Sequence, residues 1–131
     1  MSTPMTFESF RSILPRICCK DTSYDPKGWT KNNPFWGHSD VVSLLAHSVS
    51  GGMIPGVSLK GTKFARLRVH FWNAFPDGNQ VDFTRDQFGD EYPGELEIRW
   101  WEAIDLLANE STARRFQLLE IAFIIESGKH E

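Results

Sequence analysis

Three residues of the types that cooperate in nucleophilic catalysis are spaced along this chain: Ser39, His70 and Asp82. Ser39 directly precedes a stretch with helical periodicity, and the start of a helix stabilises negative charge that develops beside it. His70 and Asp82 lie in two successive segments that alternate like strands, and facing side chains of a hairpin come within about 5 Å. This order predicts a nucleophile, a base and an acid that orients the base. An alternative interpretation leaves His70 as an ordinary strand residue and Asp82 as a turn residue.

Two helical segments flank a long loop in the first part of the chain. Apolar residues three or four positions apart predict a first helix over about residues 6–18, which Pro15 bends or ends early. Residues 20–40 are rich in Asp, Asn, Pro and Gly and predict a loop, and loops of this length are often functional. The second helix is expected to begin at about Asp40 and to end at Gly51. The loop therefore delivers Ser39 to a helix start.

The middle of the chain predicts β-structure. Residues 53–59 suit an extended segment, and Pro55 favours an edge strand or a bend. Residues 64–75 alternate well enough for a strand, and a turn at 76–80 leads into a second strand at 80–84. These two strands predict an antiparallel hairpin that carries His70 and Asp82.

The last third of the chain predicts two helices, over about residues 95–110 and 112–127, with Ser111 or Thr112 as the cap of the second. The whole pattern predicts one α+β domain over residues 1–131. We expect the helix that begins at Ser39 to pack on a small antiparallel sheet, with helices at both termini.

The composition narrows the class of partner. The 14 basic and 17 acidic residues are mixed along the chain and give a net charge of −3, which disfavours nucleic acid. No stretch has the roughly 20 apolar residues of a membrane span, and the start does not resemble a signal peptide, so a cytoplasmic protein is expected. Cys18 and Cys19 are adjacent and are expected to stay reduced. The spacing of His38, His47 and His70 matches no familiar zinc site, so no metal and no cofactor is expected.

Two segments, residues 29–54 and 69–88, carry a recognisable combination of motifs. The motifs are Trp29, Asn33-Pro34, Gly37-His38-Ser39, Gly51-Gly52-Met53-Ile54, His70-Phe71-Trp72-Asn73, Asp82-Phe83-Thr84 and Gln87-Phe88. This combination resembles the YunG-like family of small bacterial proteins. The resemblance implies a papain-like (transglutaminase-like) fold of the cysteine-hydrolase type, with a triad of Cys, His and Asp at positions 39, 70 and 82.

The chain departs from that family pattern within the site, because His38-Ser39 stands where the family has Gln-Cys. A serine hydroxyl is a weaker nucleophile than a thiolate and depends on a well-placed base. Three explanations stay open: a true Ser-His-Asp hydrolase, a relative that binds without turnover, or a chain in which the cysteine has been replaced deliberately.

The sequence therefore predicts a hydrolase or acyltransferase that acts on an amide, peptide or thioester bond. The alternative is a degenerate member that binds a ligand or a protein partner. His38 is expected to donate to an oxyanion in place of the family's Gln, or to cap the loop. Trp29 and Trp36 are expected to line a substrate groove or to pack in the core. Asn73 is expected to contribute to the oxyanion or substrate-binding set, to orient the acid or to satisfy the hairpin turn. The oligomeric state stays open.

Overall fold

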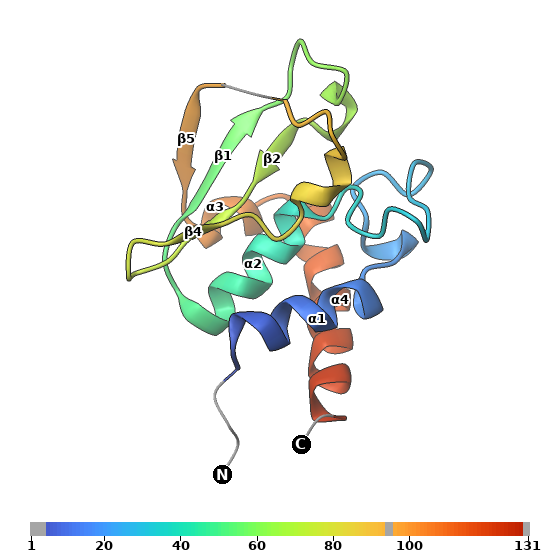
Figure 1. The fold of residues 1–131 in the computed structure, drawn as a ribbon, viewed down its shortest axis with the longest axis vertical. Coiled ribbons are helices and arrows are strands. Elements are labelled where there is room, and N and C mark those ends of the chain that lie inside the picture. Colours follow the sequence, from blue (N-terminus) through green and yellow to red (C-terminus); the bar gives the residue numbers. More distant parts are fainter. Residues whose placement is uncertain (1–4, 94–95, 130–131) are drawn as a thin grey trace.

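The computed structural model describes residues 5–93 and 96–129 and places a small sheet at one end of the molecule, with the helix Ser39–Ser50 between the sheet and the first and last helices (Figure 1). The α-helices are α1 (Phe7–Ile17), α2 (Ser39–Ser50), α3 (Ala103–Leu107) and α4 (Glu110–Gly128). Short 3-10 helices lie at Lys20–Thr22, Ala65–Leu67 and Arg85–Phe88. The strands are β1 (Ile54–Ser58), β2 (Val69–Phe71), β3 (Asn73–Ala74), β4 (Gln80–Val81) and β5 (Ile98–Trp101). The predicted α+β class is confirmed.

Helix α1 forms where its periodicity predicts it. The Thr6 side chain accepts a hydrogen bond from the N–H of Ser9 and caps the helix start. Pro15 lies inside the helix, which nevertheless continues to Ile17. One face is buried and contributes Phe10, Ile13, Leu14 and Ile17 to the main core.

Helix α2 is the central element of the fold. It begins at Ser39, one residue before the predicted start, and ends at Gly51, whose φ of 72° favours glycine. Residues Ser39 to Ala46 are all buried, because α2 packs against α4 on one side and against β1 and β2 on another. A helix buried on several sides can hold its first residue in a fixed place.

The three-stranded sheet has the order β2-β1-β5, with both pairs antiparallel. The expectation that residues 53–59 form an edge strand is therefore wrong, because β1 is the central strand. Pro55 is tolerated there although it has no N–H to donate. Its carbonyl still accepts a hydrogen bond from the N–H of Trp72 at 3.0 Å.

The prediction of a helix over residues 95–110 is wrong in its first part. Ile98–Trp101 forms β5 and pairs with β1, and only the short helix α3 follows before α4. Ile and Trp favour strands, and the open side of β1 supplies backbone partners that a helix would leave unpaired. Asn109 is the cap of α4, since its side chain accepts from the N–H of Thr112 at 3.0 Å.

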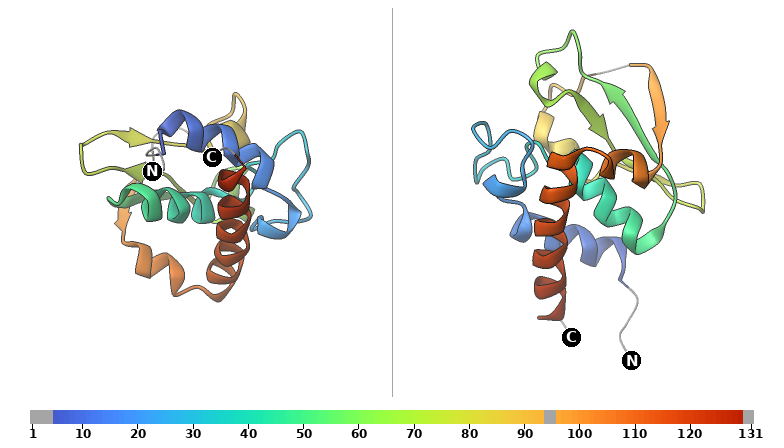
Figure 2. Two further views of the ribbon diagram at one scale, coloured as in Figure 1. Left: turned by 90° about the horizontal axis from the view of Figure 1, so that it is seen from below. Right: turned by 180° about the vertical axis from the view of Figure 1, so that it is seen from behind.

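The predicted hairpin is present as β3 and β4, in which Asn73 faces Val81. Its first arm is shorter than predicted, because Ala65–Leu67 forms a 3-10 helix and β2 pairs with β1 instead. Between these elements Arg68 has φ 66° and ψ −62°, a backbone conformation that costs a residue with a side chain roughly 1–3 kcal/mol. The right-hand view in Figure 2 shows β2 running past the N-terminal end of α2.

Candidate functional site

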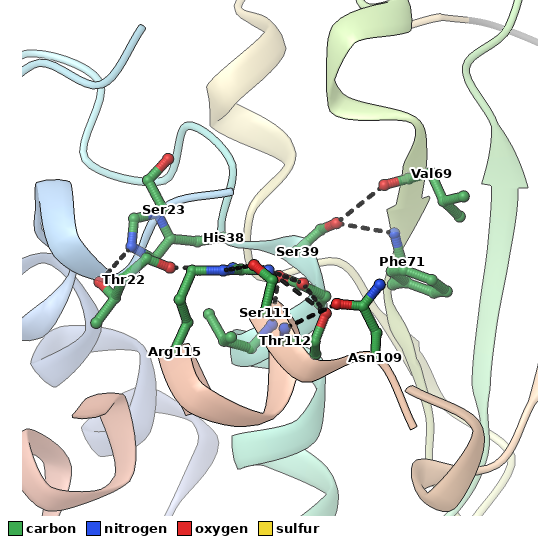
Figure 3. A network of polar contacts seen from close by, with 12 residues as sticks. Thr22, Ser23, His38, Ser39, Val69, Phe71, Asn109, Ser111, Thr112 and Arg115 are labelled. Atoms are coloured by element: carbon green, nitrogen blue, oxygen red, sulfur yellow. Dashed lines mark hydrogen bonds and ion pairs between the residues drawn. The ribbon is translucent and has the colours of Figure 1, made fainter. Parts of the chain in front are cut away.

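The side chain of Ser39 lies at the free edge of β2. The N–H of Trp72 and the carbonyl of Arg68 bond toward β1, so the alternate residues Val69 and Phe71 turn their backbone groups the other way. The Ser39 hydroxyl accepts from the N–H of Phe71 at 3.1 Å and donates to the carbonyl of Val69 at 3.5 Å (Figure 3). Ser39 thus joins the start of α2 to the strand that carries His70.

His70 is hydrogen-bonded to the acid that the sequence assigned to it. Its Nε2 lies 2.6 Å from Oδ2 of Asp82, and the imidazole is only 1% exposed. The other carboxylate oxygen of Asp82 accepts from the N–H of Thr84 at 3.2 Å, which fixes the acid. The remaining ring nitrogen, Nδ1, is buried and has no hydrogen-bond partner among the described residues. His70 is therefore oriented at one nitrogen and free at the other.

Aromatic rings hold the imidazole of His70 on several sides. The ring of Phe88 meets it edge-on at 4.8 Å and that of Tyr92 at 5.9 Å, while Trp72 lies tilted at 5.9 Å. Burial and the nearby charge of Asp82 raise the pKa of Tyr92, so its phenol stays protonated near neutral pH. The imidazole is consequently confined to one orientation by apolar contact and by the carboxylate together.

Ser39 and His70 line one pocket of about 220 Å³. Its walls come from the loop before α2, from β2 and from α3 and α4. The apolar lining comprises Leu59, Leu67, Val69, Phe71, Phe88, Trp101 and Leu106, and the polar lining includes Tyr24, Asp40, Arg68, Gln87, Asp105, Asn109 and Thr112. Ser39 and His70 form no hydrogen bond with each other, although both face this space. The pocket is the place where a ligand would meet both residues.

A buried ion pair fixes the start of α2 beneath the pocket. Arg115 of α4 binds both carboxylate oxygens of Asp40, at 3.1 and 2.5 Å, and donates to the carbonyl of Thr22 at 3.2 Å (Figure 3). Thr112 donates to the same carboxylate at 2.8 Å. This two-pronged geometry restrains both partners, so the residue next to Ser39 is tied to α4 and to the preceding loop.

The first four backbone N–H groups of α2 differ in whether they already have an acceptor. The N–H of Val42 bonds to the carbonyl of His38, and that of Val41 bonds to Oδ1 of Asp40. The N–H groups of Ser39 and Asp40 have no acceptor among the described residues. Free amides at a helix start can stabilise an oxyanion.

His38 occupies a different environment from the one expected of an oxyanion donor. The residue is fully buried, with Nδ1 at 2.9 Å from the carbonyl of Trp36 and Nε2 at 2.7 Å from the hydroxyl of Thr22. Burial lowers the pKa of His38 to about 4, only partly opposed by the bond to the Trp36 carbonyl. The ring is therefore neutral at pH 7, donates from Nδ1 and accepts at Nε2. Neither nitrogen reaches the pocket, so the side chain secures the loop instead.

The remaining predicted binding residues also lie outside the pocket lining. Trp29 donates to the carbonyl of Pro34 at 2.9 Å, and Trp36 donates to Asp25 at 3.0 Å. Both tryptophans thus brace the loop 20–38 from within. Asn73 is 1% exposed and donates to the carbonyl of Ser43 at 2.9 Å, which ties β3 to α2. The structure brings together Ser39, His70 and Asp82. It places Trp29, Trp36 and Asn73 in supporting positions outside the pocket lining.

Gln87 also belongs to the site, although a search of the sequence for catalytic residue types does not select it. Its side-chain oxygen accepts from the N–H of Gly37 at 3.1 Å, and its amide nitrogen donates to Thr84 at 3.0 Å. Its backbone carbonyl accepts from Asn33 at 3.0 Å. Gln87 therefore connects the loop that precedes Ser39 with the segment that follows Asp82. The motif Gln87-Phe88 was the one signal in the sequence that pointed to this position.

Metal-binding clusters, membrane-spanning helices and cysteines can each be located in the part of the chain that the structure describes. No group of three or more His, Cys, Asp or Glu side chains there is arranged to hold a metal ion. No helix in the same residues is long and apolar enough to cross a membrane. Cys18 and Cys19 are both free thiols, the first buried and the second exposed, and burial raises the pKa of Cys18.

Fold and site together define an α+β protein in which one pocket is lined by a serine at a helix start and by a buried histidine that is bound to an aspartate. Comparison with family models identifies the family of the chain. The model described as "YunG protein" matches residues 6–124, so the chain belongs to the YunG family, as its motifs predicted. No curated protein and no solved structure gives a significant match.

Proposed function

We propose that this protein is a hydrolase or acyltransferase that acts on an amide, peptide or thioester bond, with Ser39 as the nucleophile. The observation that carries the proposal is the state of His70. Its Nε2 is bound to Asp82 at 2.6 Å, whereas its Nδ1 is buried without a partner beside the pocket that Ser39 also lines. A base needs one nitrogen oriented and the other free to take a proton.

In the proposed reaction, the Ser39 side chain first turns from the Val69 carbonyl to His70. The bond that it gives up is long, at 3.5 Å, and is therefore weak. His70 Nδ1 takes the hydroxyl proton as the oxygen attacks the substrate carbonyl, and the free amides at the start of α2 bind the resulting oxyanion. His70 then gives the proton to the leaving amine or thiol. Water or another acceptor releases the acyl group from Ser39, with His70 again as the base.

The proposal includes the papain-like arrangement that the family resemblance implies. A nucleophile at the start of a buried helix, with its His on strand β2 and the Asp directly after strand β4, supports that arrangement. We also propose a cytoplasmic location, which the two free cysteines support.

A second candidate function is a binding module that has lost the nucleophile. The Ser39 hydroxyl favours it, because that group already satisfies the backbone at the edge of β2 and forms no hydrogen bond with His70. In this case the same pocket would bind a ligand or a peptide without turnover.

The replacement Ser39→Cys separates the two functions. If the site is competent, His70 lowers the pKa of the new thiol, which then reacts with iodoacetamide, a small amide, well below pH 8. The rate is measured by mass spectrometry of the tryptic peptides, since Lys20 and Lys31 separate position 39 from Cys18 and Cys19. Cys19, exposed and in the same molecule, gives the matched reference rate.

The serine form is tested in parallel with a fluorophosphonate, which modifies activated serines. Labelling of Ser39 that is lost in His70→Gln supports the hydrolase. A thiol at position 39 that reacts no faster than Cys19 at pH 6, together with an unlabelled serine form, would establish the binding module instead.

A further inference from the structure

Arg68 adopts a backbone conformation that glycine would adopt more easily. It has φ 66° and ψ −62°, and it is the one residue other than glycine with positive φ in the described part of the chain. Hydrogen bonds on both sides fix this conformation, from the N–H of Arg68 to the carbonyl of Ala65 at 3.0 Å and from the N–H of Leu59 to the carbonyl of Arg68 at 2.8 Å. A side chain kept at such a position calls for a reason outside backbone geometry.

The fold supplies no such reason for the guanidinium of Arg68. The residue is exposed, and within residues 5–93 and 96–129 its side chain has no hydrogen bond, ion pair or ring contact. Neighbouring cations differ in this respect, because Arg66 pairs with Asp25 at 3.4 Å and the guanidinium of Arg85 lies 4.1 Å from the centre of the Tyr92 ring. Arg68 thus combines a strained backbone with a guanidinium that has no partner among the described residues.

Its location connects Arg68 to the candidate site. Arg68 lines the pocket that Ser39 and His70 also line, and it lies two residues before His70, directly ahead of strand β2. Its place relative to the base is therefore fixed by a short, rigid piece of backbone. A cation held there can select a substrate by charge.

The other charges of the lining define what this cation can select. The carboxylate of Asp40 is neutralised by Arg115, to which it is bonded through both oxygens. Asp105 accepts from the N–H of Glu102 at the start of α3 and has no ion-pair partner among the described residues. The apolar part of the lining comes from seven side chains, and no charged residue type other than Asp40, Arg68, Asp105 and His70 is among the described lining residues. One negative charge on the ligand is favoured by Arg68, and a second near Asp105 is disfavoured.

We infer that Arg68 is a specificity-determining residue and that the pocket takes an acyl group bearing a single carboxylate, separated by a short apolar chain from the carbonyl that Ser39 attacks. The inference rests on the proposed function and adds the class of substrate to it. The guanidinium binds the carboxylate, the apolar walls contact the chain, and the scissile carbonyl lies between Ser39 and the free amides of α2.

The first test uses two alkylating agents of similar size in the Ser39→Cys background, the anion iodoacetate and the neutral iodoacetamide. Arg68→Gln is expected to lower the ratio of the iodoacetate rate to the iodoacetamide rate about tenfold at low salt, while Arg68→Lys keeps most of it. Arg114→Gln is the matched control, since Arg114 is an exposed cation on α4 outside the pocket lining. An unchanged ratio in Arg68→Gln, or an equal fall in Arg114→Gln, would overturn the inference.

This design separates the inference from the proposed function. The iodoacetamide rate and its dependence on His70 report the nucleophile alone, whereas the ratio of the two rates reports Arg68. A reactive thiol with a ratio that ignores Arg68 would remove the inference and leave the proposed function in place.

The second test needs no reaction and uses the unmodified serine protein. Glutaramate, with one carboxylate and one amide, is expected to raise the Tm, whereas glutaramide, its neutral analogue, is not. Arg68→Gln should abolish the difference, and Ser39→Ala should keep it. Equal shifts by the two compounds would contradict the inference even if Ser39 is catalytic.

Arg68→Gly provides the control for folding. Because glycine relieves the strained backbone, the Tm of this variant without ligand is expected to be equal to or above that of the unsubstituted protein. A large fall in Tm for both Arg68→Gly and Arg68→Gln would show that Arg68 has a structural role, and the inference would be wrong.

Discussion

His38 and His70 are both buried, at 0% and 1% exposure, yet they differ in what surrounds their ring nitrogens. Both nitrogens of His38 are bonded, one to a backbone carbonyl and one to the hydroxyl of Thr22. His70 has a carboxylate on one nitrogen and no partner on the other. A neutral carbonyl and a hydroxyl stabilise a neutral ring, whereas a carboxylate also stabilises a charged one.

The difference separates a structural histidine from one suited to chemistry. A base must alternate between two protonation states, and His38 is held in one of them because burial lowers its pKa to about 4. His70 can accept a proton at Nδ1 while Asp82 balances the charge that results. Burial by itself therefore does not identify the functional histidine. The carboxylate partner on one nitrogen, and the lack of any partner among the described residues on the other, do.

The largest expected effect concerns His38 and the stability of the fold. Its pKa is about 4 in the folded protein and 6.5 without perturbation, so between these values the unfolded chain binds the additional proton. Stability attributed to His38 is fully present above pH 6.5 and is lost as the pH falls toward 4, by about 3 kcal/mol. Urea denaturation at pH 7.0, 5.5 and 4.5 measures this loss.

His38→Gln removes the titrating group and is expected to flatten that part of the pH profile, at the cost of lower stability at pH 7. His47→Gln is the matched control, because His47 lies in the last turn of α2, away from the loop. If His38→Gln leaves the dependence on pH unchanged relative to His47→Gln, His38 is not the residue that burial keeps neutral.

The second expected effect concerns His70 and the reactivity of position 39. In Ser39→Cys, His70→Gln removes the base, and the thiol returns to an ordinary pKa near 8.5. The rate of alkylation by iodoacetamide at pH 7 is then expected to fall about 30-fold, and the pH profile should move upward. The same change at His38 should alter the rate per folded molecule by less than about threefold. If the alkylation rate falls equally in the two variants, the proposed difference in role between His70 and His38 is wrong.

Much of the path from sequence to site was predictable because it depends on local pattern. The turn-rich loop, the start of α2 and the hairpin after His70 follow from periodicity and turn residues. The contact between His70 and Asp82 is present, but not between facing hairpin residues as predicted, because His70 lies in β2 and Asp82 directly follows β4. Strand β5 was not predictable in this way, because Ile98–Trp101 becomes a strand only when β1 offers it backbone partners. The environment of His38 depends on Thr22, 16 residues away, and the pocket depends on α3 and α4. These are tertiary contacts that residue spacing does not encode.

The smallest expected effect concerns Asp82, whose carboxylate makes His70 different from His38. Asp82→Asn keeps the size of the side chain but removes the charge that balances a protonated His70. Alkylation of the Ser39→Cys thiol at pH 7 is therefore expected to slow about fivefold, less than in His70→Gln, because the imidazole is still present. Asp86→Asn, which removes an exposed charge in the adjacent 3-10 helix, is the control and should change the rate little. If the alkylation rate falls as far as it does in His70→Gln, Asp82 also holds the imidazole in place. If the rate does not fall, the carboxylate contributes only to the fold. The unpartnered nitrogen of His70 is then what distinguishes this residue from His38.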